Sequence, residues 1–453
     1  MYKYHTKRYL HIDRILFYTD KIKSYVENPE KVSQHGFFPF LKYMKNQSKF
    51  LGYDKDVAGK RKTKERQIMV ASHIDGFIYS HYGSVISEKY NEWALLHGID
   101  ECSIAYRNNK KGKSNIQFAA EVITTIIKYQ KCYIWVGDFT KFFDNLNHKC
   151  LKQCLRDVLN VTHMSKDYYQ VLKSLTNYSY IDLKQLRYLL TQRGINFEKN
   201  KRYFSSIKEF RKFQQETKLT QKNTGSVGIP QGSALSGLLA NIYMIHVDEE
   251  IQKIVQSSNG IYRRYSDDFI IVIPATGDCS MIEFGNIQER IKKIIKLAKV
   301  ELQQEKTVSY VYENEAIWDF DSYEGFKKKN SAVTYLGFRF DGKIVSARQR
   351  SVYKFYRGAK KTISRAVRLS KKKNSKTLLR QSVIIKRYMD VGSKPKWDKR
   401  HNRLTYGNFI SYMLRAQKEF EKIDGVECKI LEQIKHRQKI IAQYRNAKQR
   451  VKR

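Results

Sequence analysis

The stretch RRYSDDFIIVI, residues 263–273, constrains the fold of this chain more than any other segment. Two adjacent aspartates, Asp267 and Asp268, lie between a basic, aromatic segment and a run of branched apolar residues. Two apolar runs joined by a short polar stretch are typical of a strand hairpin. Because adjacent carboxylates repel each other, a protein that holds such a pair beside its core needs a cation or a proton there. The stretch therefore predicts two strands, with Ser266 and Asp267 near the turn between them.

A third aspartate ends another predicted strand. The segment KCYIWVGDF reads as a strand that ends at Asp138. Strands and helices alternate in the middle of the chain, so we expect an α/β layer whose sheet edge gathers Asp138, Asp267 and Asp268. Three carboxylates at one place suit Mg²⁺, which prefers hard oxygen ligands, and two such ions can flank an in-line phosphoryl displacement. The simpler alternative is that the adjacent pair only caps a turn, where aspartate is common.

The charge of the chain points to a polyanionic partner. Lys and Arg total 86 against 44 Asp and Glu, which gives a net charge of +42. Such a surplus favours binding of nucleic acid through its phosphates, and the 32 tyrosines and 23 phenylalanines supply rings that stack on bases. The alternative is a basic surface that serves only solubility. Charge alone does not separate RNA from DNA or lipid.

The remaining composition predicts a cytoplasmic protein that is not in the membrane. The first residues are basic and aromatic, unlike a secretory signal, and no stretch approaches the ~20 apolar residues of a membrane helix. The six cysteines show no CxxC pair, so we expect reduced thiols and no zinc site.

The pattern along the chain predicts elements of unequal clarity. Short basic amphipathic helices are expected up to about residue 55, and residues 160–222 look irregular and charged. Beyond about residue 345 the chain reads as almost entirely basic helix. The clearest helices are expected at 74–98, after the basic loop that begins AYRNN, along an apolar stripe from Leu146 to Leu159, after the loop GIPQG, and at 283–304.

Six segments in order resemble the motifs of the reverse transcriptases. One carries the first catalytic aspartate, a second shapes the template and nucleotide pocket, and YSDD matches that family's tyrosine, variable residue and two aspartates. The others resemble its lysine motif, its primer-gripping hairpin and its basic fingers segment. In chain order the six are KRKTKERQI, VGDFTKFFDNLNH, GIPQGSALSGLLANIYM, YSDD, LQQEKT and YLGF.

The resemblance implies roles for the carboxylates and the residues beside them. Asp138, Asp267 and Asp268 would hold two Mg²⁺ ions, with Mn²⁺ as an alternative, and the backbone carbonyl of Phe139 would be a further metal ligand. Lys306, in LQQEKT, would donate a proton to the leaving pyrophosphate; the alternative is a solvated surface lysine.

The resemblance also implies a binding site for deoxynucleoside triphosphates. Arg66 would grip the triphosphate through its forked guanidinium, and Gln231 and Gly232 would approach the nucleotide. The sequence leaves open which of Lys60, Lys62 and Lys64 assists Arg66. Phe143 matches the bulky steric gate that clashes with a ribose 2′-OH, although Phe143 could be a core residue and Phe142 could take the outward role.

Softer resemblances refine the function. There is no VTG, no Asn-Ala-x-x-His and no Cys- or His-rich nuclease tail, which are marks of retron and many group II intron enzymes, and Ser266 replaces the commoner alanine. Other segments resemble bacterial reverse transcriptases of antiviral defence, including the abortive-infection type. They are AYRNNKKGKSNIQFAAEV, FFDNLNH, SARQRSVYKFYRGAKKTI and NFISYMLRAQKEF.

These observations predict an α/β (α+β) right-hand polymerase fold. We expect an N-terminal helical extension over 1–55, fingers and palm with an antiparallel sheet over 56–344, and a basic helical thumb over 345–453. The expected activity is RNA-directed DNA synthesis from dNTPs on a noncoding RNA template, with a DNA product and with a defence partner protein or a second copy as further partner. The alternatives are a group II intron-type maturase, another palm enzyme such as an RNA-dependent RNA polymerase, and a non-catalytic RNA-binding protein on the same scaffold.

Overall fold

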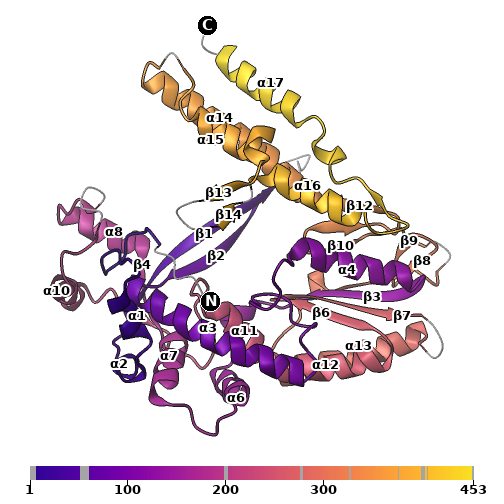
Figure 1. Cartoon of the computed structure of the whole chain (residues 1–453), viewed down its shortest axis with the longest axis horizontal. Coiled ribbons are helices and arrows are strands. Elements are labelled where there is room, and N and C mark those ends of the chain that lie inside the picture. Colours follow the sequence, from indigo (N-terminus) through magenta and orange to yellow (C-terminus); the bar gives the residue numbers. More distant parts are fainter. Residues whose placement is uncertain are drawn as a thin grey trace.

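The computed structural model describes residues 7–50, 61–197, 202–275, 279–325, 328–375, 377–398, 403–405 and 407–450. Two sheets, each with its own helices, lie on opposite sides of the view in Figure 1, and the C-terminal helices lie above them. The larger sheet carries the aspartates that the sequence singled out.

The larger sheet has five antiparallel strands in the order β6-β7-β3-β8-β9. Its central strands are apolar runs, and every residue of β7 after Asp268 is buried. Because a central strand is covered on both faces, it needs apolar side chains at successive positions rather than alternate ones. The strands are β3 (Lys131–Asp138), β6 (Ile261–Tyr265), β7 (Asp268–Pro274), β8 (Val308–Glu313) and β9 (Ala316–Asp319).

Helices cover both faces of this sheet, and the alternation along β7 shows how. Ile271 and Ile273 belong to one core cluster together with residues of α12 (Ile245–Ser257) and α13 (Met281–Leu297). Ile270 and Val272 point to the other face, into a cluster with α4 (Asn115–Lys128) and the C-terminal helices. In Figure 1, α12 and α13 lie below the sheet and α4 lies above it.

The predicted strands and most predicted helices of this region are confirmed. The YSDD segment joins β6 to β7 as a hairpin, and the stripe from Leu146 to Leu159 lies largely in α6 (His148–Leu159). The helix expected at 283–304 ends earlier, at Leu297, because Lys299 takes a left-handed backbone (φ 58°) and turns the chain back towards the sheet. The other confirmed helices are α3 (His73–Leu96), α4 after the AYRNN loop, and α11 (Ser236–Tyr243) with α12 after GIPQG.

The smaller sheet corrects the expectation for the N-terminal segment. Short helices α1 (Asp20–Val26) and α2 (Pro29–Ser33) do form, but residues 40–50 are a strand, not a helix. This strand, β1 (Phe40–Phe50), pairs antiparallel with β2 (Arg61–Val70) over ten residue pairs. The hydrogen bonds that stabilise β1 come from a segment beyond residue 60, so a local pattern does not reveal it. The domain boundary drawn at residue 55 lies between these two paired strands.

The described residues of the segment 160–222 form regular elements, contrary to the expectation of an irregular segment. Among them are three helices and two short strands, and the strands join the smaller sheet, whose order is β2-β1-β4-β5. Each helix buries only two to five residues, so no apolar face extends over the whole segment. The elements are α7 (Lys166–Thr176), β4 (Ser179–Asp182), α8 (Leu183–Gln192), α10 (Ile207–Thr217) and β5 (Gln221–Lys222).

The C-terminal region is mostly basic helix, as expected. Helix α14 (Gln349–Lys372) buries residues along one stripe, mostly at steps of three and four, and leaves its basic residues outside. A third sheet lies beside it in the order β10-β11-β12-β15: its first three strands precede α14, and β15 comes later in the chain. Strand β12 begins at residue 344, where the predicted fingers and palm end. The strands of that sheet are β10 (Val333–Tyr335), β11 (Phe338–Phe340), β12 (Ile344–Ala347) and β15 (Glu427–Cys428).

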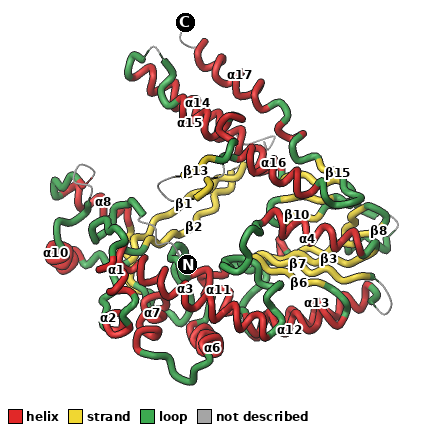
Figure 2. Tube along the Cα trace, viewed as in Figure 1, coloured by secondary structure: helices red, strands yellow, loops and turns green. Residues whose placement is uncertain are grey.

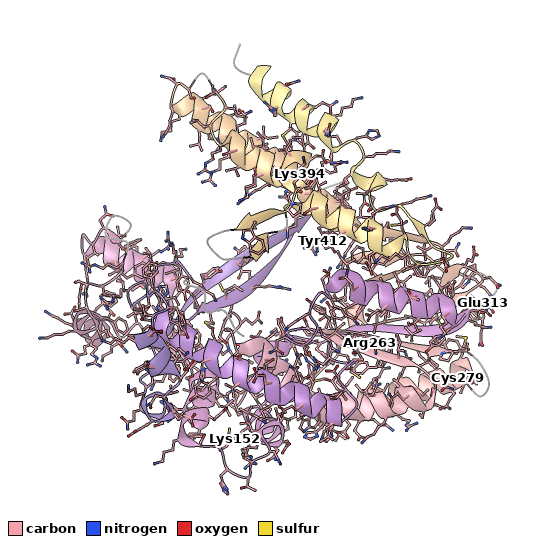
Figure 3. All side chains as sticks on the ribbon, in the orientation of Figure 1. Lys152, Arg263, Cys279, Glu313, Lys394 and Tyr412 are labelled. Carbon is pink, nitrogen blue, oxygen red and sulfur yellow. The ribbon has the colours of Figure 1, made fainter. Side chains whose placement is uncertain are left out.

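Short strands interrupt the helices here. Strands β13 (Lys396–Asp398) and β14 (Arg403–Thr405) pair antiparallel, which the prediction of continuous helix missed. Tyr412 of α16 accepts a hydrogen bond from Asn115 of α4 (2.9 Å), which ties this region to the larger sheet (Figure 3). The helices, seen in Figure 2, are α14 (Gln349–Lys372), α15 (Gln381–Tyr388), α16 (Phe409–Phe420) and α17 (Arg437–Arg450).

Candidate active site

The strand register brings the three predicted carboxylates to one edge of the larger sheet. Asp138, the last residue of β3, pairs directly with Asp268, the first residue of β7. The amide of Phe139 donates a hydrogen bond to the backbone carbonyl of Asp267 (3.1 Å), so the hairpin turn lies against the end of β3. One residue earlier, a Cβ on Gly137 would lie 2.3 Å from the ring of Phe269, so glycine lets the two strands approach closely beside the carboxylates.

A buried arginine holds the turn that carries Asp267. Ser266 has a left-handed backbone (φ 62°), which is unfavourable for a residue with a side chain. Arg264, whose side chain is fully buried, donates from Nη1 to the carbonyl of Ser266 (3.0 Å) and from Nε and Nη2 to the carboxylate of Asp248 on α12 (2.8 and 2.5 Å). Asn241 on α11 also accepts from Nη1 (3.2 Å). The Arg264 guanidinium therefore links helices α11 and α12 to the turn that carries Asp267.

Negative charge is concentrated at this edge. Burial, reinforced by the neighbouring carboxylates of Asp267 and Asp138, raises the pKa of Asp268 to about 7, although Lys306 acts in the opposite direction. Lys306 Nζ lies 2.5 Å from Asp138 Oδ2. A short 3-10 turn, Gln304–Lys306, places this lysine, and the amide of Gln303 donates to the carbonyl of Asp138 (2.8 Å). Lys306 of the LQQEKT segment and Asp138 at the end of β3, which were predicted from separate segments, are therefore in contact.

The donor set fits a hard divalent cation by its chemistry. Three carboxylates crowd one edge, and a single ammonium offsets them, so the edge retains negative charge that a Mg²⁺ ion would neutralise. Among the described residues, no three acidic, His or Cys side chains are positioned to hold a metal ion together. Asp138, Asp267 and Asp268 are the residues that would hold the ions.

Phe139, Phe142 and Phe143 differ in exposure. Phe139 and Phe142 are buried and stack on each other, with ring centroids 5.4 Å apart. Phe143 is only half-buried, and its carbonyl accepts a hydrogen bond from the amide of Ile229 (2.9 Å). The alternative in which Phe142 takes the outward role is therefore disfavoured, since its ring is part of the core.

The loop with Gln231 and Gly232 lies against the smaller sheet. The amide of Met69 donates to the carbonyl of Gln231 (2.8 Å), and a Cβ on Gly232 (φ 126°) would lie 2.5 Å from the carbonyl oxygen of Met69. Only glycine fits this close approach. Arg66 is exposed on the same strand, β2, three residues before Met69. Lys60 lies outside the described residues, and Lys62 and Lys64 are described only as members of β2.

A loop outside the predicted site residues also lies close to this hairpin. Residues 103–107 run beside β6, and Ser103 pairs with Arg264 as an isolated parallel bridge. Tyr106 in this loop has a left-handed backbone (φ 56°) and is 54% exposed. The signals in the sequence were weak: Arg264 reads as one of several basic residues before YSDD, and backbone angles cannot be read from AYRNN.

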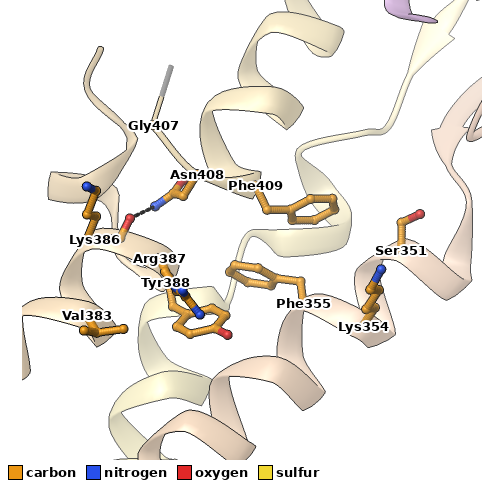
Figure 4. Close-up of a pocket in the computed structure, with 10 residues that line it drawn as sticks. All are labelled: Ser351, Lys354, Phe355, Val383, Lys386, Arg387, Tyr388, Gly407, Asn408 and Phe409. Atoms are coloured by element: carbon orange, nitrogen blue, oxygen red, sulfur yellow. Dashed lines mark hydrogen bonds between the residues drawn. The ribbon is translucent and has the colours of Figure 1, made fainter. Parts of the chain in front are cut away.

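A separate cavity of about 770 Å³ lies in the C-terminal region. Figure 4 shows Phe355, Tyr388 and Phe409 in its lining, and Phe355 and Phe409 are stacked with centroids 5.1 Å apart. Three cations that also line it, Lys354, Lys386 and Arg387, are all exposed. The cavity combines aromatic and basic groups, away from the three aspartates.

The larger sheet is antiparallel and carries two adjacent aspartates at its edge, beside a third aspartate at the end of β3. Together with the helical C-terminal region, this arrangement defines a right-hand polymerase fold. The family model described as reverse transcriptase (RNA-dependent DNA polymerase) matches residues 101–340, more than half of the chain. The chain belongs to this reverse transcriptase family.

Two solved structures are similar to the chain at low identity. Apo telomerase from Candida tropicalis, truncated from its C-terminal domain, is 14% identical, with a TM-score of 0.38, over 67% of this chain and 55% of that one. Telomerase from Candida albicans, in complex with a fragment of telomeric RNA, is 13% identical, with a TM-score of 0.39, over 94% of this chain and 65% of that one. The chain thus spans less than two thirds of either. No curated protein matches it.

Two further observations concern the surroundings in which the protein works. All six cysteines are free thiols. Among the described residues, no helix has both the length and the apolar character needed to cross a bilayer.

Proposed function

We propose that this protein is an RNA-directed DNA polymerase that extends DNA by two-metal phosphoryl transfer. The observation that carries the proposal is the direct pairing of Asp138 with Asp268, with Asp267 in the adjoining turn. A protein that only binds RNA has no use for three crowded carboxylates beside a phosphate backbone, because they repel it. The non-catalytic alternative is disfavoured for this reason.

The carboxylates and the lysine would divide the work. Asp138, Asp267, Asp268 and the carbonyl of Phe139 would hold Mg²⁺, or Mn²⁺ in its place; the bound ions supply activation of the attacking hydroxyl and stabilisation of the leaving pyrophosphate. Lys306 is the proton donor in this proposal. Its present bond to Asp138 (2.5 Å) holds the ammonium at the reaction centre, from which it would turn to the pyrophosphate.

The nucleotide would contact residues supplied by both sheets. The loop of Gln231 and Gly232 is bonded to β2 at Met69, three residues after Arg66, and in this proposal the Arg66 guanidinium and the loop backbone both contact the triphosphate. Phe143, half-buried in the short helix α5 (Phe142–Asn145) that follows β3, would exclude a ribose 2′-OH. Deoxynucleotides are then the preferred substrates, which favours a DNA polymerase over an RNA polymerase.

The biological role rests on the softer resemblance. The segments that resemble bacterial defence reverse transcriptases support a role against phage, with a dedicated noncoding RNA as template and a DNA product. A defence-system partner protein or a second copy of the chain would complete the system, in the cytoplasm. The group II intron-type maturase remains the second candidate; sequencing the RNA and DNA that copurify with the protein separates the two.

The test of polymerase activity is Asp138→Asn, measured as incorporation of dNTPs on a primed RNA template with Mg²⁺. The amide keeps the shape of the carboxylate but loses the charge that attracts the metal, so incorporation should be abolished while thermal stability and RNA binding stay near those of the parent. Glu92→Gln, on the exposed surface of α3, is the matched control and should retain activity. Normal synthesis by Asp138→Asn would overturn the proposal.

A further inference from the structure

The loop of residues 103–107 connects α3 to α4 and runs alongside the strand that leads into the catalytic turn. The amide of Arg264 donates to the carbonyl of Cys102 (2.7 Å), and the amide of Ile104 donates to the carbonyl of Arg264 (3.0 Å). Ser103 and Arg264 form a single parallel bridge, so at this point the loop runs in the same direction as β6, towards Ser266 and Asp267. Ala105 and Tyr106 follow directly after these hydrogen bonds.

Both neighbours of Tyr106 are fixed. The carbonyl of Ala105 accepts a hydrogen bond from Asn241 Nδ2 (2.7 Å), and Asn241 also accepts from Arg264, which binds the carbonyl of Ser266. On the other side, the fully buried side chain of Arg107 donates to the carbonyl of Ser103 (3.0 Å) and to the carboxylate of Asp100, and it lies over the ring of Tyr90. The position of Tyr106 is thus determined by the same network that holds the catalytic turn.

The conformation of Tyr106 has a backbone cost without a matching gain in burial. Its φ of 56° is unfavourable for a tyrosine, yet the side chain remains 54% exposed. One face of the ring packs on the backbone of α11 at Gly237, where an added Cβ would lie 2.8 Å from ring carbons Cγ and Cδ1. Glycine lets the ring approach the helix backbone there, while about half of the residue's surface stays exposed (54%).

We propose that the Tyr106 ring stacks on the nucleobase at the 3′ end of the strand being extended. This inference rests on the proposed polymerase function, because the 3′ hydroxyl must lie at the aspartates that the loop runs towards. An aromatic ring held rigidly on a helix backbone is a suitable platform for any of the four bases, since every base has a flat face. Tyr106 is then a positioning residue for the primer end rather than a catalytic residue.

The test measures binding without chemistry. Full-length protein is titrated with a dideoxy-terminated primer on an RNA template, and the dissociation constant is compared between parent and Tyr106→Ala. Loss of one base–aromatic stack should weaken binding by about 5- to 150-fold. Tyr106→Phe, which keeps the ring, should bind within about twofold of the parent. Gly237→Ala, which displaces the ring from below, should also weaken binding.

Two arms identify the stacked base. An abasic residue at the primer 3′ end should weaken binding by the parent and have little further effect on Tyr106→Ala, whereas an abasic residue in the template opposite should affect both proteins equally. Tyr188→Ala, at an exposed tyrosine on α8 (64%, against 54% for Tyr106), is the matched control and should bind as the parent does.

The outcomes separate this inference from the proposed function. If the parent extends primers but Tyr106→Ala binds them as tightly as the parent, the inference is wrong and the polymerase assignment stands. If the template abasic residue, and not the primer one, loses its effect in Tyr106→Ala, the ring stacks on the template and the primer assignment is wrong. If the parent neither binds nor extends a primed template, the proposed function itself fails.

Discussion

At the scale of single residues, the site depends on one buried ion pair. Arg264 and Asp248 both have fully buried side chains, and Tyr262 donates a further hydrogen bond to Asp248 (2.8 Å). Desolvation of two charges offsets much of their attraction, so such a pair contributes little net stability when intact. Its value here is geometric, since it fixes the carbonyl of Ser266 beside Asp267.

Breaking this pair should cost far more than the pair contributes. Asp248→Ala leaves the Arg264 guanidinium buried without its counter-ion, and we expect the free energy of unfolding to fall by about 3–5 kcal/mol. Urea denaturation measures the change. Glu92→Ala, which breaks the exposed ion pair with Lys89, should cost less than about 1 kcal/mol. Equal losses in the two variants would show that Arg264 is not held by Asp248.

A second residue-scale effect concerns the start of α3. Asp13 Oδ2 accepts hydrogen bonds from the amides of His73 and Ile74 (2.8 and 3.1 Å), so a residue far away in sequence caps the helix. Burial, with a smaller effect from the Asp75 carboxylate, raises the pKa of Asp13 to about 7. Burial also lowers the pKa of the neighbouring His11 to about 3. The folded protein therefore favours the neutral form of both side chains.

These pKa shifts predict opposite pH dependences. For Asp13 the folded state binds the proton more tightly, so its contribution to stability is lost as pH rises from about 4 to about 7. For His11 the folded state binds the proton less tightly, so stability is gained as pH rises from about 3 to about 6.5.

Substitution separates the two. Asp13→Asn keeps an acceptor for the helix amides but cannot ionise, so its stability relative to the parent should increase steadily between pH 4 and pH 7. Chemical denaturation at several pH values measures the difference. A difference that does not change with pH would mean that Asp13 titrates as an exposed carboxyl does.

Local sequence was informative about some residues and silent about others. The adjacent aspartates alone left a turn cap open, and they were assigned to the site because six segments in order resemble the motifs of reverse transcriptases. The choice between Phe142 and Phe143 stayed open because both are large and apolar, and only burial of the Phe142 ring separates them. Tyr106 was missed because neither its backbone conformation nor its position on Gly237 leaves a mark in the local pattern.

At the scale of elements, the C-terminal helices offer a second surface for nucleic acid. The cavity between α14, α15 and α16 has stacked rings in its lining and three exposed cations around it (Figure 4). The basic run of residues 371–376 includes Lys376, which lies outside the described residues. The cavity cations therefore make the better-defined test of phosphate binding.

Replacing Lys354, Lys386 and Arg387 together with glutamine should reduce both the affinity for single-stranded RNA and its salt dependence. For every phosphate that the variant no longer neutralises, the slope of log affinity against log salt should flatten by about 0.7. The matched control neutralises Arg290, Lys293 and Lys296, which are exposed on α13 below the larger sheet. If both triple variants have the same slope, the cavity is not part of the binding surface.

The elements that local patterns failed to predict share a cause. The central strands of the larger sheet are apolar at successive positions and were recognised directly. Strand β1 is rich in lysine and polar residues, and it is a strand because β2 pairs with it across ten positions. Helices α8 and α10 each bury only two residues, and these complete their core with Ile12 and Leu41 from the N-terminal segment. A pattern read from neighbouring residues cannot reveal such contacts between segments that are far apart in the sequence.

At the scale of the whole molecule, the net charge of +42 sets how the protein responds to ions. Like charges on one folded chain repel each other, which destabilises the compact state. The repulsion acts over a Debye length, which falls from ~30 Å at 0.01 M salt to ~10 Å at 0.1 M. Salt should therefore stabilise this protein rather than weaken it.

We expect the melting temperature to rise between 0.01 M and 0.15 M NaCl and then to level off, because screening of exposed charges is by then largely complete. KCl at the same ionic strength should give the same rise, since screening does not depend on the identity of the monovalent cation. Single-stranded RNA at low salt should raise the melting temperature further, because a ligand at about 100 times its dissociation constant stabilises the folded state by about 2.7 kcal/mol. A melting temperature that falls as salt is added would mean that attraction within ion pairs outweighs repulsion among the excess positive charges. The excess charge would then be compensated within the fold and would not be free to bind a polyanion.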